Sequence, residues 1–321
     1  MRYVSYPFSE IKRLSFYLAT EEFLALHYPP EDYFFMWQVQ PTVIFGRNQL
    51  IENEVNLDYV RANGIEYYRR KSGGGCVYAD FSNIMFSYIT ASFHKDFVFS
   101  SYLSRIVDML NSLGLHAEAS GRNDILVDGL KVSGNAFYRV NDRSIVHGTM
   151  LFDTDLEIMV RAITPDNEKL VSKGIASVRN RVMNLKGHIQ LNMEQFKEYV
   201  RSHLTESAIV LTDSDIQAIE TIEKTYLDPD FIYGKNPHYT ILRKKHVSAG
   251  LLEVSLVLKN NIVKQISLLG DYFVIADPDI FLKKLIQVPF TKADFTHALV
   301  GLDLSEYVYN LTLNDFLEII F

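Results

Sequence analysis

The chain is poor in cysteine, in long apolar runs and in excess positive charge, and each shortage excludes a class of protein. Cys76 is its single cysteine, so no disulfide can form within the chain and a reducing compartment such as the cytoplasm is expected. No stretch approaches the roughly 20 apolar residues that cross a bilayer, and the N-terminus lacks the apolar run of a signal peptide. We therefore expect no membrane partner.

The charge balance argues against nucleic acid as a partner. The 321 residues include 32 Lys and Arg against 39 Asp and Glu, a formal net charge of −7. Affinity for a phosphate backbone needs clustered Lys and Arg, which an acidic chain does not favour. With 48% apolar residues, the chain is long enough for one large core or two unequal ones.

Apolar periodicity and helix-breaking residues predict a β-rich chain with a few amphipathic helices. The predicted helices are Ser15–His27, a short one capped by Asn56 and ending at Gly64, one that begins at Ser100 or Ser101 and ends at Gly114, and Asp213–Tyr226. The predicted strands are Tyr33–Val39 and Thr42–Phe45 as neighbours, Ile65–Arg69, Cys76–Tyr78, Ile84–Thr90, and short strands between Ile125 and Phe152 broken at Asp128-Gly129, Gly134 and Asn141-Asp142.

The last ~80 residues differ in pattern from the rest and predict a small accessory domain. Strand-like runs at Leu251–Leu258 and Ile262–Leu268 are joined by Asn260-Asn261, a pair that tolerates the positive φ of tight hairpins. Asp277-Pro278 indicates a helix start. We place the boundary near residues 240–248, with a catalytic domain at 1–243 and an accessory domain at 247–321.

A glycine run forms the first segment suited to chemistry. It lies in Arg69-Arg70-Lys71-Ser72-Gly73-Gly74-Gly75-Cys76-Val77-Tyr78. Three glycines let backbone N–H groups approach an anion closely, and three basic residues precede them. The pattern predicts a phosphate or carboxylate cradle, whereas an isolated run of this kind is equally typical of a flexible hairpin. It is not a Walker loop, because no Gly-Lys-Ser/Thr follows.

Two further segments carry polar groups between short strands. Gly121-Arg122-Asn123-Asp124-Ile125 precedes Asp128-Gly129-Leu130-Lys131-Val132-Ser133-Gly134-Asn135-Ala136, and His147-Gly148-Thr149-Met150-Leu151-Phe152 follows. Lys131 stands among small and apolar residues, where an ammonium needs an anionic partner such as a nucleotide phosphate. Taken alone, Lys131 would be an ordinary hairpin lysine and His147 a structural histidine.

Together the three segments resemble lipoate–protein ligases in order and spacing. Ala19-Thr20-Glu21-Glu22, Val43-Ile44-Phe45-Gly46-Arg47-Asn48 and Tyr233-Gly234-Lys235-Asn236-Pro237 are similar to further family segments, so the resemblance covers roughly residues 15–240. It implies an α/β (α+β) fold. The catalytic domain would have a mixed sheet like that of biotin ligases and class II aminoacyl-tRNA synthetases, followed by a small α+β C-terminal domain.

The family reaction has two steps. Lipoate and ATP form lipoyl-AMP and pyrophosphate, and a lysine of an acceptor then displaces AMP. The implied cofactors are ATP and Mg²⁺, with lipoic acid as substrate or octanoate in its place. The implied partners are the lipoyl domains of 2-oxoacid dehydrogenase complexes and the glycine-cleavage H protein.

The resemblance also implies roles for particular residues. Lys131 is the central catalytic residue, and Asp124 is the candidate for holding magnesium. The implied ATP site comprises Arg70, Gly75, Cys76, Val77, Tyr78, Asn123, Asp124 and Lys131. The implied lipoate site comprises Ser72, Gly73, Gly74, Lys131, His147, Gly148 and Thr149.

Three positions depart from the family pattern and leave alternatives open. Ala79 stands where a histidine near the acyl site is common, Leu130 where a basic residue often precedes the lysine, and Ser82 where glycine is usual. Ala79 raises the alternative of a lipoate-binding paralogue without catalysis. Cys76 raises that of an ATP-independent lipoyl or octanoyl transferase with a thiol nucleophile. A biotin ligase is disfavoured because no Gly-Arg-Gly-Arg-x-Gly loop is present, and a DNA-binding repressor because the N-terminus has no helix-turn-helix pattern.

Overall fold

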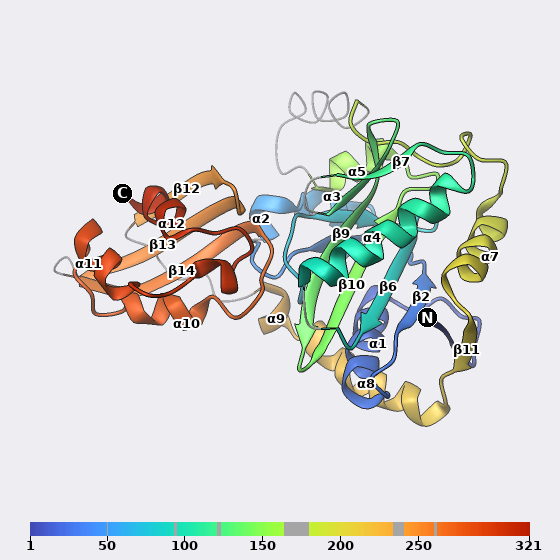
Figure 1. The fold of residues 1–321 in the computed structure, drawn as a ribbon, viewed down its shortest axis with the longest axis horizontal. Coiled ribbons are helices and arrows are strands. Elements are labelled where there is room, and N and C mark those ends of the chain that lie inside the picture. Colours follow the sequence, from blue (N-terminus) through green and yellow to red (C-terminus); the bar gives the residue numbers. More distant parts are fainter. Residues whose placement is uncertain (50, 93–94, 121–122, 164–179, 234–240, 260–261) are drawn as a thin grey trace. The chain divides into compact units, whose positions relative to one another are not determined.

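A computed structural model describes the chain except for residues 50, 93–94, 121–122, 164–179, 234–240 and 260–261. The chain divides into two compact units (Figure 1). The first unit comprises Met1–Phe45, Glu52–Arg70 and Cys76–Ile232. The second unit comprises Gly46–Ile51, Lys71–Gly75 and Tyr233–Phe321. Two short segments of the N-terminal half thus pack with the C-terminal part, while the domain bounds 1–243 and 247–321 stay a prediction.

An eight-stranded mixed sheet forms the centre of the first unit. Its strands, in spatial order, are β11 (Ser207–Val210), β1 (Arg2–Ser5), β2 (Tyr33–Trp37), β6 (Ile84–Thr90), β10 (Arg143–Met150), β9 (Leu130–Val140), β8 (Asp124–Val127) and β7 (Ala117–Ser120). The pairs β11–β1 and β1–β2 are parallel, and the remaining neighbours are antiparallel.

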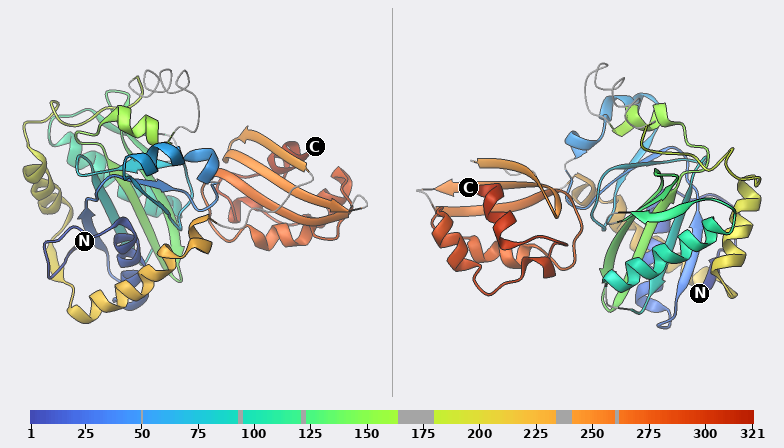
Figure 2. Two further views of the ribbon diagram at one scale, coloured as in Figure 1. Left: turned by 180° about the vertical axis from the view of Figure 1, so that it is seen from behind. Right: turned by 45° about the horizontal axis from the view of Figure 1, so that its top comes forward.

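Helices cover both faces of this sheet (Figure 2), because successive residues of the central strands point to opposite faces and apolar side chains lie on both. On one face, α4 (Lys95–Asn111) and α7 (Met193–Leu204) pack over a core that includes Phe86, Phe137 and Val146. On the other face, α1 (Leu14–His27) and α8 (Asp213–Leu227) pack over a core that includes Phe35 and Tyr138.

A small three-stranded sheet adds to the second of these faces. Its order is β4 (Glu66–Arg69), β3 (Thr42–Phe45) and β5 (Val77–Ala79), accompanied by α2 (Ile51–Glu54), α3 (Leu57–Ala62), α5 (Leu156–Ile163) and α9 (Pro229–Tyr233). The expectation that β2 and β3 are neighbours is wrong, because β2 pairs with β1 and β6, whereas β3 pairs with β4 and β5. The link between them contains Pro41, which has no N–H for a ladder and lets the chain leave the large sheet.

The second unit is a small α+β fold. A three-stranded antiparallel sheet is formed by β12 (Ile241–Val247), β13 (Gly250–Lys259) and β14 (Ile262–Tyr272). Its helices are α10 (Asp279–Leu282), η1 (Lys283–Leu285), α11 (Lys292–Ala298), η2 (Leu304–Glu306) and α12 (Leu313–Ile320). The apolar side chains of strands and helices share one core, and Asn260-Asn261 lies outside the described residues. The predicted fold class, a mixed sheet with a small α+β addition, is confirmed.

Two element boundaries differ from the prediction for physical reasons. Helix α4 begins at Lys95, not at Ser100 or Ser101, because Val98 and Phe99 continue its buried face upstream. Strand β9 runs through Gly134 without a break. A register shift against β8 absorbs one extra residue there, so the glycine lies inside the ladder.

Candidate functional site

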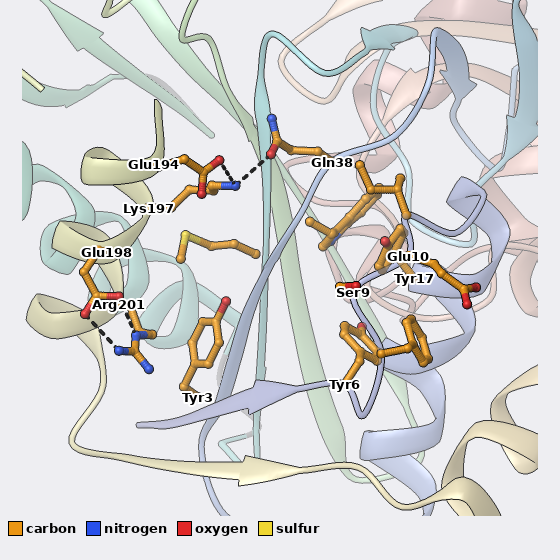
Figure 3. Close-up of a pocket in the computed structure, with 14 residues that line it drawn as sticks. Tyr3, Tyr6, Ser9, Glu10, Tyr17, Gln38, Glu194, Lys197, Glu198 and Arg201 are labelled. Atoms are coloured by element: carbon orange, nitrogen blue, oxygen red, sulfur yellow. Dashed lines mark hydrogen bonds and ion pairs between the residues drawn. The ribbon is translucent and has the colours of Figure 1, made fainter. Parts of the chain in front are cut away.

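A cavity of about 420 Å³ lies between β1, β2 and α7 and contains none of the predicted site residues (Figure 3). Four of its five charged side chains form two ion pairs with one another. Arg201 pairs with Glu198 at 2.9 Å, and Lys197 pairs with Glu194 at 2.6 Å and donates to Gln38 at 3.1 Å. These four charged side chains are thus paired with one another and are not aimed at a ligand.

Lys131 lies at a β-bulge near the start of β9. The pairs Ile125–Ser133 and Leu126–Lys131 leave Val132 as the extra residue of the bulge. On its other side, the Lys131 N–H donates to the Arg181 carbonyl at 2.8 Å, and its carbonyl accepts from Met183 N–H at 2.9 Å. The backbone of Lys131 is therefore fixed from both sides.

The Lys131 ammonium lies 2.8 Å from Oδ1 of Asp124 and over Gly134. The two side chains are 37% and 32% exposed, so water screens the pair, and pairs of this kind contribute about 0–1 kcal/mol. A Cβ on Gly134 would lie 2.9 Å from both Cε and Nζ of Lys131. The glycine therefore makes room for the ammonium, and the weak ion pair can be exchanged for a substrate anion.

Two residues of the third predicted segment, His147 and Thr149, lie on the same face of the sheet as the Lys131 ammonium. Gly134 is opposite Thr149, and Ala136 is opposite His147, and directly opposed residues of antiparallel strands share a face. The second and third predicted segments are thus brought together by the pairing of β9 with β10.

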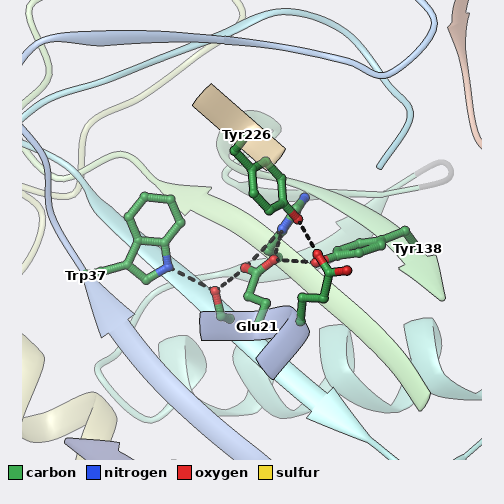
Figure 4. A network of polar contacts seen from close by, with 7 residues as sticks. Glu21, Trp37, Tyr138 and Tyr226 are labelled. Atoms are coloured by element: carbon green, nitrogen blue, oxygen red, sulfur yellow. Dashed lines mark hydrogen bonds and ion pairs between the residues drawn. The ribbon is translucent and has the colours of Figure 1, made fainter. Parts of the chain in front are cut away.

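His147 belongs to a buried polar network beneath this face (Figure 4). Its Nδ1 lies 2.8 Å from Glu21, whose carboxylate is fully buried and also accepts from the hydroxyl of Tyr138 at 3.1 Å. Ser87 donates to Glu21 as well and accepts from Trp37 Nε1 at 2.9 Å. A buried carboxylate needs such donors. The contacts with Glu21 explain the conformation of His147. The assignment of His147 to the lipoate site stays a prediction.

The sequence did not predict this network, apart from the family segment that contains Glu21. A signal was present. Glu21 follows Leu18 and Ala19 in a helix whose residues are almost all buried, where an acidic side chain must find partners. Those partners, Ser87, Tyr138 and His147, come from β6, β9 and β10, so spacing along the chain could not identify them.

The glycine run packs within the second unit. The Gly74 N–H donates to the Tyr272 carbonyl at 3.0 Å, and Arg47 N–H donates to the Ser72 carbonyl at 2.9 Å. A Cβ on Gly73 would lie 2.1 Å from the Tyr272 carbonyl oxygen. Close backbone packing thus gives a second reason for glycine here, beside the predicted anion cradle of Ser72–Gly75.

The basic residues before the run are held in different ways. Arg69 donates from Nε to the carbonyls of Phe231 and Ile232 at 2.9 and 3.0 Å, and its guanidinium lies over the Phe45 ring, so it has a structural role. Arg70 is 5% exposed and donates from Nη1 to the Ile44 carbonyl at 3.2 Å.

The pKa of the neighbouring Cys76 thiol is shifted in the direction that disfavours a nucleophile. Burial raises the pKa of the Cys76 thiol, Glu54 raises it further, and Arg70 lowers it without reversing the shift. A thiolate nucleophile needs a lowered pKa. Val77 and Ala79 point into the core shared with α1 and α8, and Tyr78 is buried.

Metal binding depends on few donors. Within the described part of the chain, no group of three or more His, Cys, Asp and Glu is placed to hold a metal ion. Magnesium often takes one or two carboxylates and completes its shell with phosphate oxygens and water. A single carboxylate, that of Asp124, is therefore enough for this mode of binding.

None of the described helices is both long and apolar enough to cross a membrane.

Comparisons with known proteins agree on one family. The family model "Lipoyl protein ligase A/B catalytic domain" matches residues 14–205, and "Bacterial lipoate protein ligase C-terminus" matches residues 236–320. Lipoate-protein ligase LplJ of Bacillus subtilis is 34% identical over 319 residues, covering 95% of this chain and 96% of that protein.

Solved structures show the same fold. LipL1 of P. falciparum in complex with lipoate has a TM-score of 0.78 at 22% identity, covering 99% of this chain and 97% of that chain. Lipoate-protein ligase A bound with ATP has a TM-score of 0.62 at 23% identity, covering 72% of this chain and 97% of that chain.

Proposed function

This chain belongs to the lipoate–protein ligase family, and on that premise we propose that it activates lipoate with ATP and transfers the lipoyl group to a lysine of an acceptor protein. One observation carries the proposal. The Lys131 ammonium lies over Gly134, on the sheet face that also presents Thr149, and forms a partly exposed ion pair with Asp124. A positive charge in this position can bind both the lipoate carboxylate and the α-phosphate of ATP.

In the first step, a lipoate carboxylate oxygen attacks the α-phosphorus of ATP, and the bond to pyrophosphate breaks. Two negative groups approach each other in this step, which the Lys131 ammonium would favour by lying between them. In the second step, the acceptor lysine amine attacks the lipoyl carbonyl, AMP leaves with the electron pair, and the amine loses a proton to solvent or a base not yet assigned. Lys131 would also stabilise the departing AMP.

The remaining assignments rest on the resemblance together with burial. Arg70, whose guanidinium is buried beside β3, would bind phosphate, and Gly75, Cys76, Val77 and Tyr78 would line the nucleotide through their backbones. Asp124 would hold Mg²⁺ together with the phosphates, and the ion supplies charge neutralisation when bound. The ATP bound to the related ligase A supports ATP as the nucleotide.

The proposal also includes the residues that bind lipoate and the proteins that accept the lipoyl group. Ser72, Gly73, Gly74, His147, Gly148 and Thr149 would border the lipoate, and the lipoate bound to the P. falciparum relative supports that substrate. Lipoyl domains of 2-oxoacid dehydrogenases and the H protein are the proposed acceptors. A cytoplasmic location is proposed from the single cysteine, Cys76.

Pyrophosphate release tests the proposal. The wild-type protein with Mg-ATP should release pyrophosphate only when lipoate is added. Lys131→Ala should lose this activity by about a hundredfold or more, because oxyanion-type charges supply several kcal/mol. Release without lipoate, or an unchanged rate in Lys131→Ala, would show that the proposed chemistry is wrong.

A further inference from the structure

A pair of asparagines ties together the two strands that carry Asp124 and Lys131. Asn123 donates from Nδ2 to the Asn135 carbonyl at 2.7 Å. In return, the Asn123 carbonyl accepts from both the backbone N–H and the Nδ2 of Asn135, each at 3.0 Å. Asn135 is 4% exposed, so its side chain is shielded from water, and its bonds with Asn123 are part-buried.

This pair, Asn123 and Asn135 with their mutual hydrogen bonds, is called the asparagine lock, or simply the lock, and lies directly beside the bulge. Asn123 precedes Asp124, and Asn135 follows Gly134, the residue over which the Lys131 ammonium lies. Asn135 also donates to the Ser133 hydroxyl at 3.1 Å, inside the bulged strand. The bulge breaks the regular ladder between β8 and β9, so these side-chain bonds replace the register control that the ladder loses.

Gly148 completes the arrangement from the neighbouring strand. It is opposite Asn135 in the β9–β10 pairing. A Cβ on Gly148 would lie 2.1 Å from the Asn135 Oδ1 and 2.8 Å from the Gly134 carbonyl oxygen. Only glycine at this position leaves the Asn135 amide in place. Packing against Asn135 therefore explains why residue 148 is glycine without any contact with lipoate.

We propose that Asn135, held by Asn123 and seated over Gly148, is a positioning residue that sets the Lys131 ammonium for adenylate formation. Its side chain lies on the face opposite the ammonium, as the alternation along β9 requires. It therefore acts through the strand backbone and through Lys131, without touching substrate. The inference rests on the proposed function, because it assigns the lock to the Lys131 step.

Loss of the lock should reduce the rate of that step. Displacement of a catalytic group by about 1 Å costs on the order of a hundredfold. A partial displacement in Asn135→Ala should lower lipoate-dependent pyrophosphate release by about tenfold. Asn135→Asp keeps the shape but replaces the donating amide by an acceptor that faces the Asn123 carbonyl, so its loss should be at least as large.

Asn111→Ala is the matched control. The side-chain amide of Asn111 also forms two hydrogen bonds with backbone groups. It donates to the Ala117 carbonyl at 3.2 Å and accepts from the Ala117 N–H at 2.7 Å. It joins the end of α4 to β7 and has no contact with the lock among the described interactions. Its variant should lose a similar amount of thermal stability and keep the rate.

A double-mutant cycle separates positioning from general structural damage. The loss caused by Asn135→Ala should largely disappear in a Lys131→Ala background, because the residue acts through that ammonium. Gly148→Ala should reduce the rate in the wild type and cost less when Asn135 is already alanine.

Four outcomes decide the inference. A tenfold loss that vanishes without Lys131 supports it. An undiminished rate in Asn135→Ala, or a loss that persists in full without Lys131, overturns it while leaving the proposed function intact. Absence of lipoate-dependent release from the wild-type protein would instead overturn the proposed function, and the inference with it.

Discussion

Replacing Gly134 with alanine should separate activity from stability. The added Cβ would lie 2.9 Å from both Cε and Nζ of Lys131, whereas non-bonded carbon atoms favour about 3.5–4.0 Å. The end of a lysine side chain is flexible, so the ammonium should retreat by roughly 0.6–1 Å while the backbone stays in place. Gly134 does not have a positive φ, so alanine meets no backbone strain there.

The expected cost falls on the reaction. A retreat approaching 1 Å costs on the order of a hundredfold, so we expect a ten- to hundredfold loss of adenylate formation, about 1.4–2.7 kcal/mol. Glycine inside a strand costs about 0.5–1 kcal/mol relative to alanine, so stability should not fall.

Two assays measure these quantities on the same protein. Lipoate-dependent pyrophosphate release gives the rate, and urea unfolding gives the free energy of unfolding. The control is Gly134→Ala in a Lys131→Ala background, where the substitution should have no further effect on the rate. A fully active Gly134→Ala protein would refute the reasoning, because the ammonium could not then need the space above this glycine.

Four further predictions address other parts of the structure. Lys131→Arg should recover little of the activity lost in Lys131→Ala, because a planar guanidinium does not replace a compact ammonium; single-turnover adenylation would measure this. Cys76→Ala should retain acyl transfer, since burial raises the pKa of the thiol; transfer abolished by this change and not requiring ATP would favour the thiol mechanism. Glu21→Ala should lower the free energy of unfolding by about 3–5 kcal/mol, because several buried donors lose their shared acceptor; a loss under 1 kcal/mol in urea titrations would contradict this. Burial opposes ionisation of Asp215, but hydrogen bonds from Thr212 and Tyr28 outweigh it and hold its pKa below the usual 3.8; the stabilisation is present above pH 3.8 and is lost as pH falls below it, so the destabilisation measured for Tyr28→Phe should shrink in acid.

Much of the fold could be predicted because local signals agree with the tertiary structure. The helix at Ser15–His27, the strand Ile84–Thr90 and the cap at Asn56, whose side chain accepts from Tyr59 N–H, are confirmed. Local signals failed where long-range packing decided. Ser100 and Ser101 indicate a start for α4 that is too late, because Phe99 upstream is buried on the same helix face.

The site could be predicted in part. Lys131, Gly134 and Thr149 come together because β9 and β10 are joined by a short turn, so sequence neighbours become spatial neighbours. Gly134 was expected to break a strand, but the bulge and the nearby ammonium explain it inside one. The contact of Gly73 with Tyr272 joins residues far apart in the chain, which no local pattern encodes.

Mass spectrometry of an acceptor tests the central claim most directly. An isolated lipoyl domain would be incubated with the protein, lipoate and Mg-ATP. The account predicts a mass increase of about 188 Da on one lysine, the value for a lipoyl amide formed with loss of water, and only when ATP is present. An unmodified acceptor under these conditions, or the same increase without ATP, would contradict it.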